Sequence, residues 1–304
     1  SVRKVSLIIA SLLFAGCTGS LETESVKPVV VVTSSVALSF VESIAQDTVE
    51  IILLVPNNID THTYEPKPSE LRSLESASLV VMPDENLNMS ITQVVNLSVD
   101  KENILDLNKV SLQESDYVYR DPEGKTGRNV HTWTDPVLAA KWIKPLAAEL
   151  INVVPEHKSL LESNALKMER SLEDLSKEIE SAMYSIASDE RKMVVYHDAW
   201  EYFGQRYNTE IIGSLQALNY AEPSAGEIAS MAQEIKREGV RAFFGSEVFP
   251  SDVMEALERE SGAKYVPGLA DDALPGERGT TEHSYVSMMT YNLNLIAENL
   301  RGPV

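Results

Sequence analysis

The segment Pro155–Ala187 reads PEHKSLLESNALKMERSLEDLSKEIESAMYSIA and carries the clearest periodicity in the chain. Its apolar residues are spaced alternately four and three apart, which is typical of one face of an α-helix. They are Leu161, Ala165, Met168, Leu172, Leu175, Ile179, Ala182 and Ile186. Charged residues fill the other face, and Glu173 precedes Lys177 by four positions, as a helical ion pair requires. The pattern predicts one helix of roughly 45 Å.

The same spacing would also suit a dimeric coiled coil. Strand-like apolar segments lie on both sides of residues 155–187, however, and could pack on such a helix within one chain. We therefore expect a linking helix over 155–187 that joins an N-terminal lobe, residues 28–154, to a C-terminal lobe, residues 188–304. We also expect a monomer.

Both lobes show apolar segments alternating with helical ones, a pattern that indicates parallel sheets covered on both faces. The strands expected in the N-terminal lobe are Val29–Val32, Ile51–Val55, Leu79–Met82 and Ile104–Leu107. Those expected in the C-terminal lobe are Met193–Tyr196, Glu210–Gly213, Ala242–Gly245 and Tyr265–Val266. Asp135 followed by Pro136 predicts a helix start, with the helix running to about Leu150 and bending at Pro145. The fold class is α/β, with two (β/α) Rossmann-like lobes joined by one long helix.

The charge of the chain narrows its possible partners. The 304 residues carry a net charge of −20, and the pI is near 4.7. Such a surface would be repelled by a phosphate backbone, so nucleic-acid binding is excluded. Cys17 is the single cysteine in the sequence, so neither an intrachain disulfide nor a thiolate metal cluster can form.

The first residues resemble a secretion signal. Arg3 and Lys4 precede the apolar run Val5–Ala15, which is too short to remain as a membrane-spanning helix. The ending Ala15-Gly16-Cys17 resembles the lipobox of prokaryotic lipoproteins, which implies lipidation of Cys17. We expect a signal peptide over 1–16, a tether over 17–27 and anchoring to the outer face of the cell membrane, or a periplasmic location. The alternative is a plain signal peptide cut nearby.

Three histidines share a setting. His62, His131 and His197 each lie in a loop after a strand or just before a helix, and Asp271-Asp272 follow the last expected strand. Ligands of open α/β sheets bind outside the carboxyl ends of the strands. Three imidazoles and one carboxylate, two donors from each lobe, would fill a tetrahedral zinc site. A single loop histidine is more often an ordinary surface residue, so this reasoning alone leaves the site open.

Several motifs then point to one family. His62-Thr-Tyr-Glu65-Pro with Pro68-Ser69 resembles D-P-H-x-Y-E-P-x-P-S of the zinc/manganese substrate-binding proteins of ABC transporters. His131-x-Trp-x-Asp135-Pro is similar to that family's H-x-W-x-D-P, and His197-Asp-Ala-Trp-x-Tyr-Phe203 to its H-D-A-[FY]-x-Y-F. Glu222-Pro-Ser and Ser287-Met-Met-x-Tyr-Asn-Leu293 also match. The resemblance extends over about residues 28–301.

The resemblance implies a metal site between the lobes. Its ligands would be His62, His131, His197 and Asp272, with Asp271 as the fallback and Glu65 as a partner of the ligands. Two features depart from the family: Thr61 replaces a proline, and residues 84–95 lack the expected N-G-x-x-x-E-x-W pattern. The His-rich loop of many zinc-specific members is absent as well.

The implied function is capture of a divalent metal outside the cell and its delivery to an ABC transporter permease. Three nitrogen donors and one carboxylate favour Zn²⁺, with Mn²⁺ or Fe²⁺ as alternatives. We expect no enzyme, because four protein ligands leave no position for a reactive water. The alternatives are an adhesin, a secreted zinc hydrolase using Glu65 as base, and a siderophore- or haem-binding protein.

Overall fold

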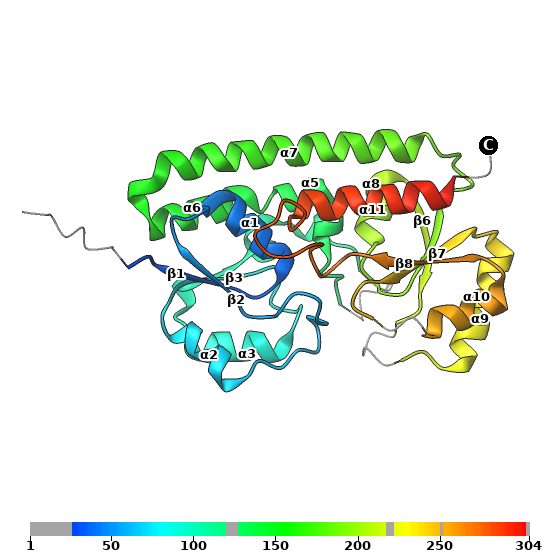
Figure 1. The fold of residues 1–304 in the computed structure, drawn as a ribbon, viewed down its shortest axis with the longest axis horizontal. Coiled ribbons are helices and arrows are strands. Elements are labelled where there is room, and N and C mark those ends of the chain that lie inside the picture. The colour runs from blue at the N-terminus through cyan, green and yellow to red at the C-terminus, as the bar shows by residue number, and fades with distance from the viewer. Residues whose placement is uncertain (1–25, 120–126, 217–221, 250–251, 302–304) are drawn as a thin grey trace, which may run out of the picture.

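The computed structural model describes residues 26–119, 127–216, 222–249 and 252–301. The predicted signal peptide, Cys17 and most of the predicted tether lie outside these residues. The described chain forms two lobes, and the long helix α7 (Lys158–Tyr184) extends along one side of both (Figure 1). None of the described helices is long and apolar enough to cross a membrane.

The N-terminal lobe is built on an all-parallel sheet with the strand order β2-β1-β3-β4. Its strands are β1 (Val29–Val32), β2 (Glu50–Leu53), β3 (Ala77–Met82) and β4 (Ile104–Asp106). Its helices are α1 (Ser35–Ala45), α2 (Pro68–Glu75), α3 (Met89–Ser98), α4 (Leu107–Ser111), α5 (Pro136–Ala140) and α6 (Ile143–Val153). Successive side chains of a strand face opposite sides of a sheet. Val30 and Val32 accordingly pack in the core that contains α1 and α6, and Val31 packs toward α2 and α3.

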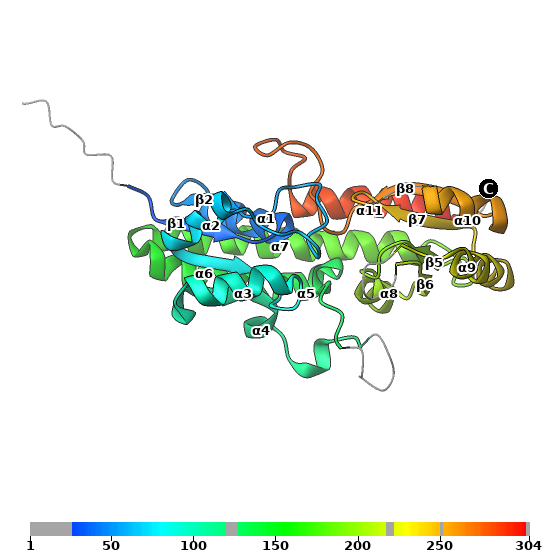
Figure 2. The same ribbon diagram turned by 90° about the horizontal axis from the view of Figure 1, so that it is seen from below.

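The C-terminal lobe repeats this arrangement with the order β6-β5-β7-β8, again all parallel. Its strands are β5 (Lys192–Val195), β6 (Glu210–Ser214), β7 (Ala242–Ser246) and β8 (Lys264–Leu269). Its helices are α8 (Glu201–Tyr207), α9 (Ala225–Glu238), α10 (Asp252–Ser261) and α11 (Tyr285–Leu300). Short 3-10 turns are η1 (Lys101–Asn103), η2 (Glu114–Asp116), η3 (Thr132–Thr134) and η4 (Pro155–His157). Helices α9 and α10 cover one face of the sheet, and α11 lies beside α7 on the other (Figures 1 and 2).

Helix α7 joins the two lobes through one hydrophobic core. Its buried face packs on α1, α5, α6 and α11, so the periodic apolar face that would suit a coiled-coil partner is covered within the chain. The residues of this face are Leu161, Asn164, Ala165, Met168, Leu172, Leu175, Ile179 and Met183. The same core contains Val32 from the first sheet and Phe244 from the second. The two sheets are therefore held in a fixed relation by packing as well as by the chain connection.

The structure confirms the α/β class, the two parallel sheets and the long helix, and it corrects some local detail. Residues 155–157 form a 3-10 turn rather than the first turn of the long helix. The helix expected from Pro136 to Leu150 is two helices that break at Lys141 and Trp142. Pro145 explains the break, because its ring would clash with the carbonyl of Lys141 in a continuous helix. It instead occupies the first turn of α6, where it needs no hydrogen-bond donor.

The shared core can be tested with two substitutions on α7. Leu172 is 1 % exposed and Leu166 is 53 % exposed. Leu172→Ala should lower the free energy of unfolding by about 2–5 kcal/mol, because it leaves a cavity in the shared core. Leu166→Ala should change it by less than about 0.5 kcal/mol. Urea unfolding of both variants provides the comparison, and equal midpoints would contradict the assignment of the buried face.

Candidate metal centre

Four polar side chains from four loops meet between the lobes. His62 lies in the loop after β2, His131 immediately before η3, His197 two residues after β5, and Asp272 in the loop after β8. Each offers one donor atom, and the four donor atoms lie within 4.8 Å of one another. All four residues are buried. The structure thus brings together the four residues named from the sequence, two from each lobe.

The distances between the donor atoms suit a small cation. The three histidine Nε2 atoms lie 3.1, 3.1 and 2.9 Å apart. Asp272 Oδ2 lies 3.3 Å from His62 Nε2 and 3.8 Å from His197 Nε2. Bonds of 2.0–2.1 Å to a tetrahedral zinc would place donors about 3.3 Å apart. The observed distances scatter around that value.

The other ring nitrogen of each histidine faces an oxygen. His62 Nδ1 lies 3.1 Å from the carbonyl of Leu87, and His131 Nδ1 lies 2.8 Å from Asn129 Oδ1. His197 Nδ1 makes a short contact with Gln216 Oε1. An oxygen acceptor assigns the proton to Nδ1 and leaves a lone pair on Nε2. Three lone pairs then face one point, which is the arrangement that a metal ion requires.

The acidic member of the group is ready to bind a cation. In the described part of the chain, Asp272 Oδ2 is buried and has no hydrogen-bond partner. Burial raises the pKa of Asp272, but the neighbouring His62 and His197 outweigh burial and lower the net pKa below its ordinary value. Burial, followed by the proximity of His62, lowers the pKa of His197 to about 4. At neutral pH the group therefore offers the neutral imidazole of His197 and the carboxylate of Asp272.

The two other acidic candidates take different positions. The backbone carbonyl of Asp271 accepts from Trp133 Nε1 at 2.7 Å, and its carboxylate accepts from Trp200 Nε1 at 3.1 Å. Asp272, and not Asp271, is the carboxylate in the group of four. Glu65 is exposed and lies outside that group. A supporting role for Glu65 stays a prediction.

Sequence reasoning missed the residues that orient the donors. Asn129 precedes His131 by two positions, and Gln216 follows β6 much as His197 follows β5. Position after a strand was the signal that could have found Gln216. Glu247 likewise follows β7 directly, and its carboxylate accepts the backbone N–H groups of the Asp272 loop. Position after a strand marks Gln216 and Glu247 as candidates, but which segment each one contacts depends on the fold and cannot be read from the spacing.

Hydrogen bonds across the lobe boundary fix the loops that carry the donors. Asn129 Nδ2 donates to the carbonyl of Asp198 at 3.0 Å, and Thr134 Oγ1 donates to that of Ala199 at 2.9 Å. On the other side, Leu274 N–H donates to Asn57 Oδ1 at 2.9 Å. The loops bearing His131 and His197 are thereby tied to each other, and the Asp272 loop is tied to the N-terminal lobe.

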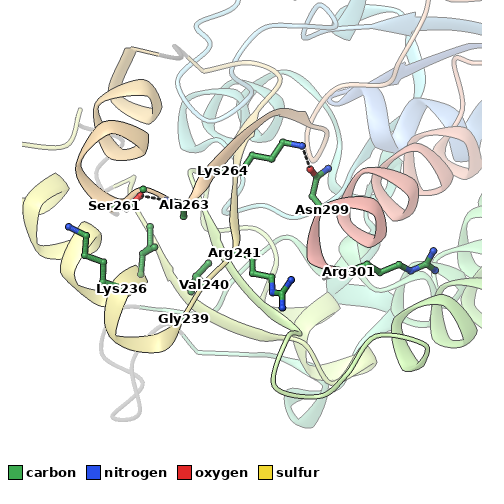
Figure 3. A pocket seen from close by; sticks show the side chains of 11 residues that line it. Lys236, Gly239, Val240, Arg241, Ser261, Ala263, Lys264, Asn299 and Arg301 are labelled. Carbon is green, nitrogen blue, oxygen red and sulfur yellow. Dashed lines mark hydrogen bonds between the residues drawn. The ribbon is translucent and has the colours of Figure 1, made fainter. Parts of the chain in front are cut away.

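A hollow of about 410 Å³ lies away from this site, at the amino ends of β7 and β8 (Figure 3). Its charged lining residues are Lys236, Arg241, Lys264 and Arg301. Arg241 pairs with Glu190, Lys264 donates to Asn299, and Lys236 extends away from the other cations (Figure 3). These charges do not converge on one point, in contrast to the four donors between the lobes.

The fold and the site can be compared with known proteins. Residues 30–299 match the family described as zinc-uptake complex component A, periplasmic. The chain is 24 % identical to the high-affinity zinc uptake system protein ZnuA of Bacillus subtilis, over 97 % of this chain and 94 % of that protein. It is 26 % identical to the manganese ABC transporter substrate-binding lipoprotein ScaA of Streptococcus gordonii, over 97 % of both chains.

A solved structure shows the same fold. The periplasmic zinc-binding protein TroA of Treponema pallidum superimposes with a TM-score of 0.84 at 24 % identity, over 91 % of this chain and all of that one. At this identity the likeness concerns the fold alone. The match over residues 30–299 establishes the relationship, and this chain belongs to the periplasmic zinc-uptake complex component A family, a family of solute-binding proteins and not of enzymes.

Proposed function

We propose that this chain captures one divalent metal ion outside the cytoplasm and delivers it to an ABC transporter permease. The ligands are His62, His131, His197 and Asp272. The observation that carries the proposal is the convergence of three buried imidazole nitrogens and one buried carboxylate oxygen on one point. Without a cation, these groups would leave buried polar atoms facing one another, which is unfavourable. The relatives named above belong to uptake systems and ABC transporters.

Zinc is the metal that we propose. Imidazole nitrogen suits zinc better than it suits manganese, and zinc lies above manganese and iron in the Irving–Williams order. The distances between donors suit a tetrahedral ion. The named relatives are described with zinc in one case and manganese in the other, so the donor set, and not the relatives, supports this choice.

We propose further that the protein works as a monomer held at the membrane by a lipid on Cys17. The basic and apolar residues before Cys17 support secretion. The streptococcal relative is described as a lipoprotein. A secreted zinc hydrolase is disfavoured, because a catalytic zinc keeps a coordination position open for water. Four protein donors would fill every position of a tetrahedral zinc at this site.

Metal preference can be measured on protein that has been stripped of metal. Incubation with equimolar Zn²⁺, Mn²⁺ and Fe²⁺ without oxygen, followed by desalting and elemental analysis, should give one zinc per chain and little of the other two. The reason is the nitrogen-rich donor set. One manganese or iron per chain would contradict the choice of zinc but preserve the site.

The ligand assignment can be tested with matched histidine variants. His197→Ala should weaken zinc binding by more than about 100-fold, because loss of an outer-shell partner alone costs 10–100-fold. His157 belongs to η4, outside the group of four donors, so His157→Ala serves as the control and should bind like the wild type. Competition with a zinc chelator gives both affinities. Equal affinities would show that His197 is not a ligand.

The stability of the metal-free protein should depend on pH because folding lowers the pKa of His197. Its pKa is about 4 in the folded chain and about 6.5 when unfolded. Between those values the unfolded chain binds more protons, so the free energy of unfolding falls as the pH is lowered. The expected loss from pH 7 to pH 4 is about 3 kcal/mol for this group. Urea unfolding should show a smaller pH dependence in His197→Ala. If the free energies of unfolding of the wild type and His197→Ala changed equally with pH, the lowered pKa of His197 would be contradicted.

A further inference from the structure

Glu247 connects the end of β7 to the loop that carries Asp272. Its Oε1 atom accepts three consecutive backbone N–H groups, from Asp271 at 3.1 Å, Asp272 at 3.0 Å and Ala273 at 2.9 Å. The other carboxylate oxygen, Oε2, accepts from Ser246 Oγ at 2.8 Å. A single side chain thus satisfies the backbone donors on both sides of the proposed fourth ligand.

Three successive N–H groups that point to one oxygen define the path of the backbone. Rotation of any of these peptide units would remove a hydrogen bond and leave a buried N–H group without its acceptor, which is unfavourable. This backbone sets where the Asp272 side chain starts, and the carboxylate then reaches the two histidines, with Oδ2 at 3.3 Å from His62 Nε2 and 3.8 Å from His197 Nε2. The loop is held beyond this point by Asn57, which pairs with both backbone groups of Leu274.

We propose that Glu247 is a positioning residue that directs the Asp272 carboxylate at the bound metal ion. The inference rests on the proposed function, since it assigns a role in that same site. Glu247 itself is absent from the group of four donors, so it acts through Asp272. Removal of its carboxylate leaves three amides without their acceptor, and the loop would then turn toward other partners.

Two other roles for Glu247 would give different results when its side chain is removed. If Glu247 only added negative charge near the cation, its effect would remain when Asp272 is absent. If it only stabilised the fold, its removal would lower the melting temperature without changing the coordination of the metal. A role in positioning requires that the effect disappear without Asp272, because residues that act as a unit are not additive.

The experiment compares the wild type with E247A, D272A and the double variant. Affinities for Zn²⁺ are measured by competition with a chelator, and the visible absorption of the Co²⁺-loaded proteins reports the coordination. E247A should weaken zinc binding by about 10–100-fold, as outer-shell partners do. In the D272A background, E247A should cause no further loss. The Co²⁺ spectrum of E247A should shift toward that of D272A.

Conservative variants separate geometry from charge. E247Q keeps an oxygen at the position that accepts the three N–H groups, so it should retain an affinity within about threefold of the wild type. E255Q removes a charge from an exposed position on α10 and should have no effect. If circular dichroism shows that E247A is unfolded, E247D replaces it, because its shorter side chain cannot reach all three amides.

The outcomes are distinguishable. An equal loss from E247A with and without Asp272, or an E247Q variant as weak as E247A, overturns the positioning role. If D272A weakens binding but E247A does not, this inference fails and the proposed function stands. If the wild type binds neither Zn²⁺ nor Co²⁺, or D272A binds like the wild type, the proposed ligand set fails and the inference fails with it.

Discussion

The burial of one face of α7 holds the two lobes in a single relative position. Its apolar side chains form one continuous core with residues from both sheets, so neither lobe can move without exposing apolar surface to water. The proposed site depends on this constraint. His62 and His131 come from one lobe, and His197 and Asp272 come from the other. A fixed relation between the sheets keeps these four donors within reach of one ion.

The electrostatics of the site follow from burial. Three imidazoles and one carboxylate are withdrawn from water. Each imidazole is oriented through its Nδ1 atom by an oxygen of Leu87, Asn129 or Gln216. A preorganised set of lone pairs is unfavourable when isolated and favourable around a cation. The same residues therefore give the chain a reason to bind a metal ion and a defined geometry in which to hold it.

The sequence predicted the architecture well because strands and helices follow local patterns. The eight expected strands correspond to β1–β8, and the periodicity of residues 161–179 identified the buried face of α7. The bend expected at Pro145 is a break at Lys141 and Trp142, because the proline ring clashes with the carbonyl four residues before it. The candidate ligands came from a family resemblance, since composition and spacing alone left the histidines ambiguous. Gln216 and Glu247 were missed, because their roles depend on where other loops lie.

The central claim is that three imidazoles and one carboxylate, shared between two lobes, surround one ion. X-ray absorption at the zinc edge of protein loaded with one equivalent of zinc tests it most directly. The account predicts four nitrogen or oxygen neighbours at about 2.0–2.1 Å, with outer-shell scattering from three imidazole rings. Scattering from fewer than two imidazoles, or a first shell dominated by water, would contradict it.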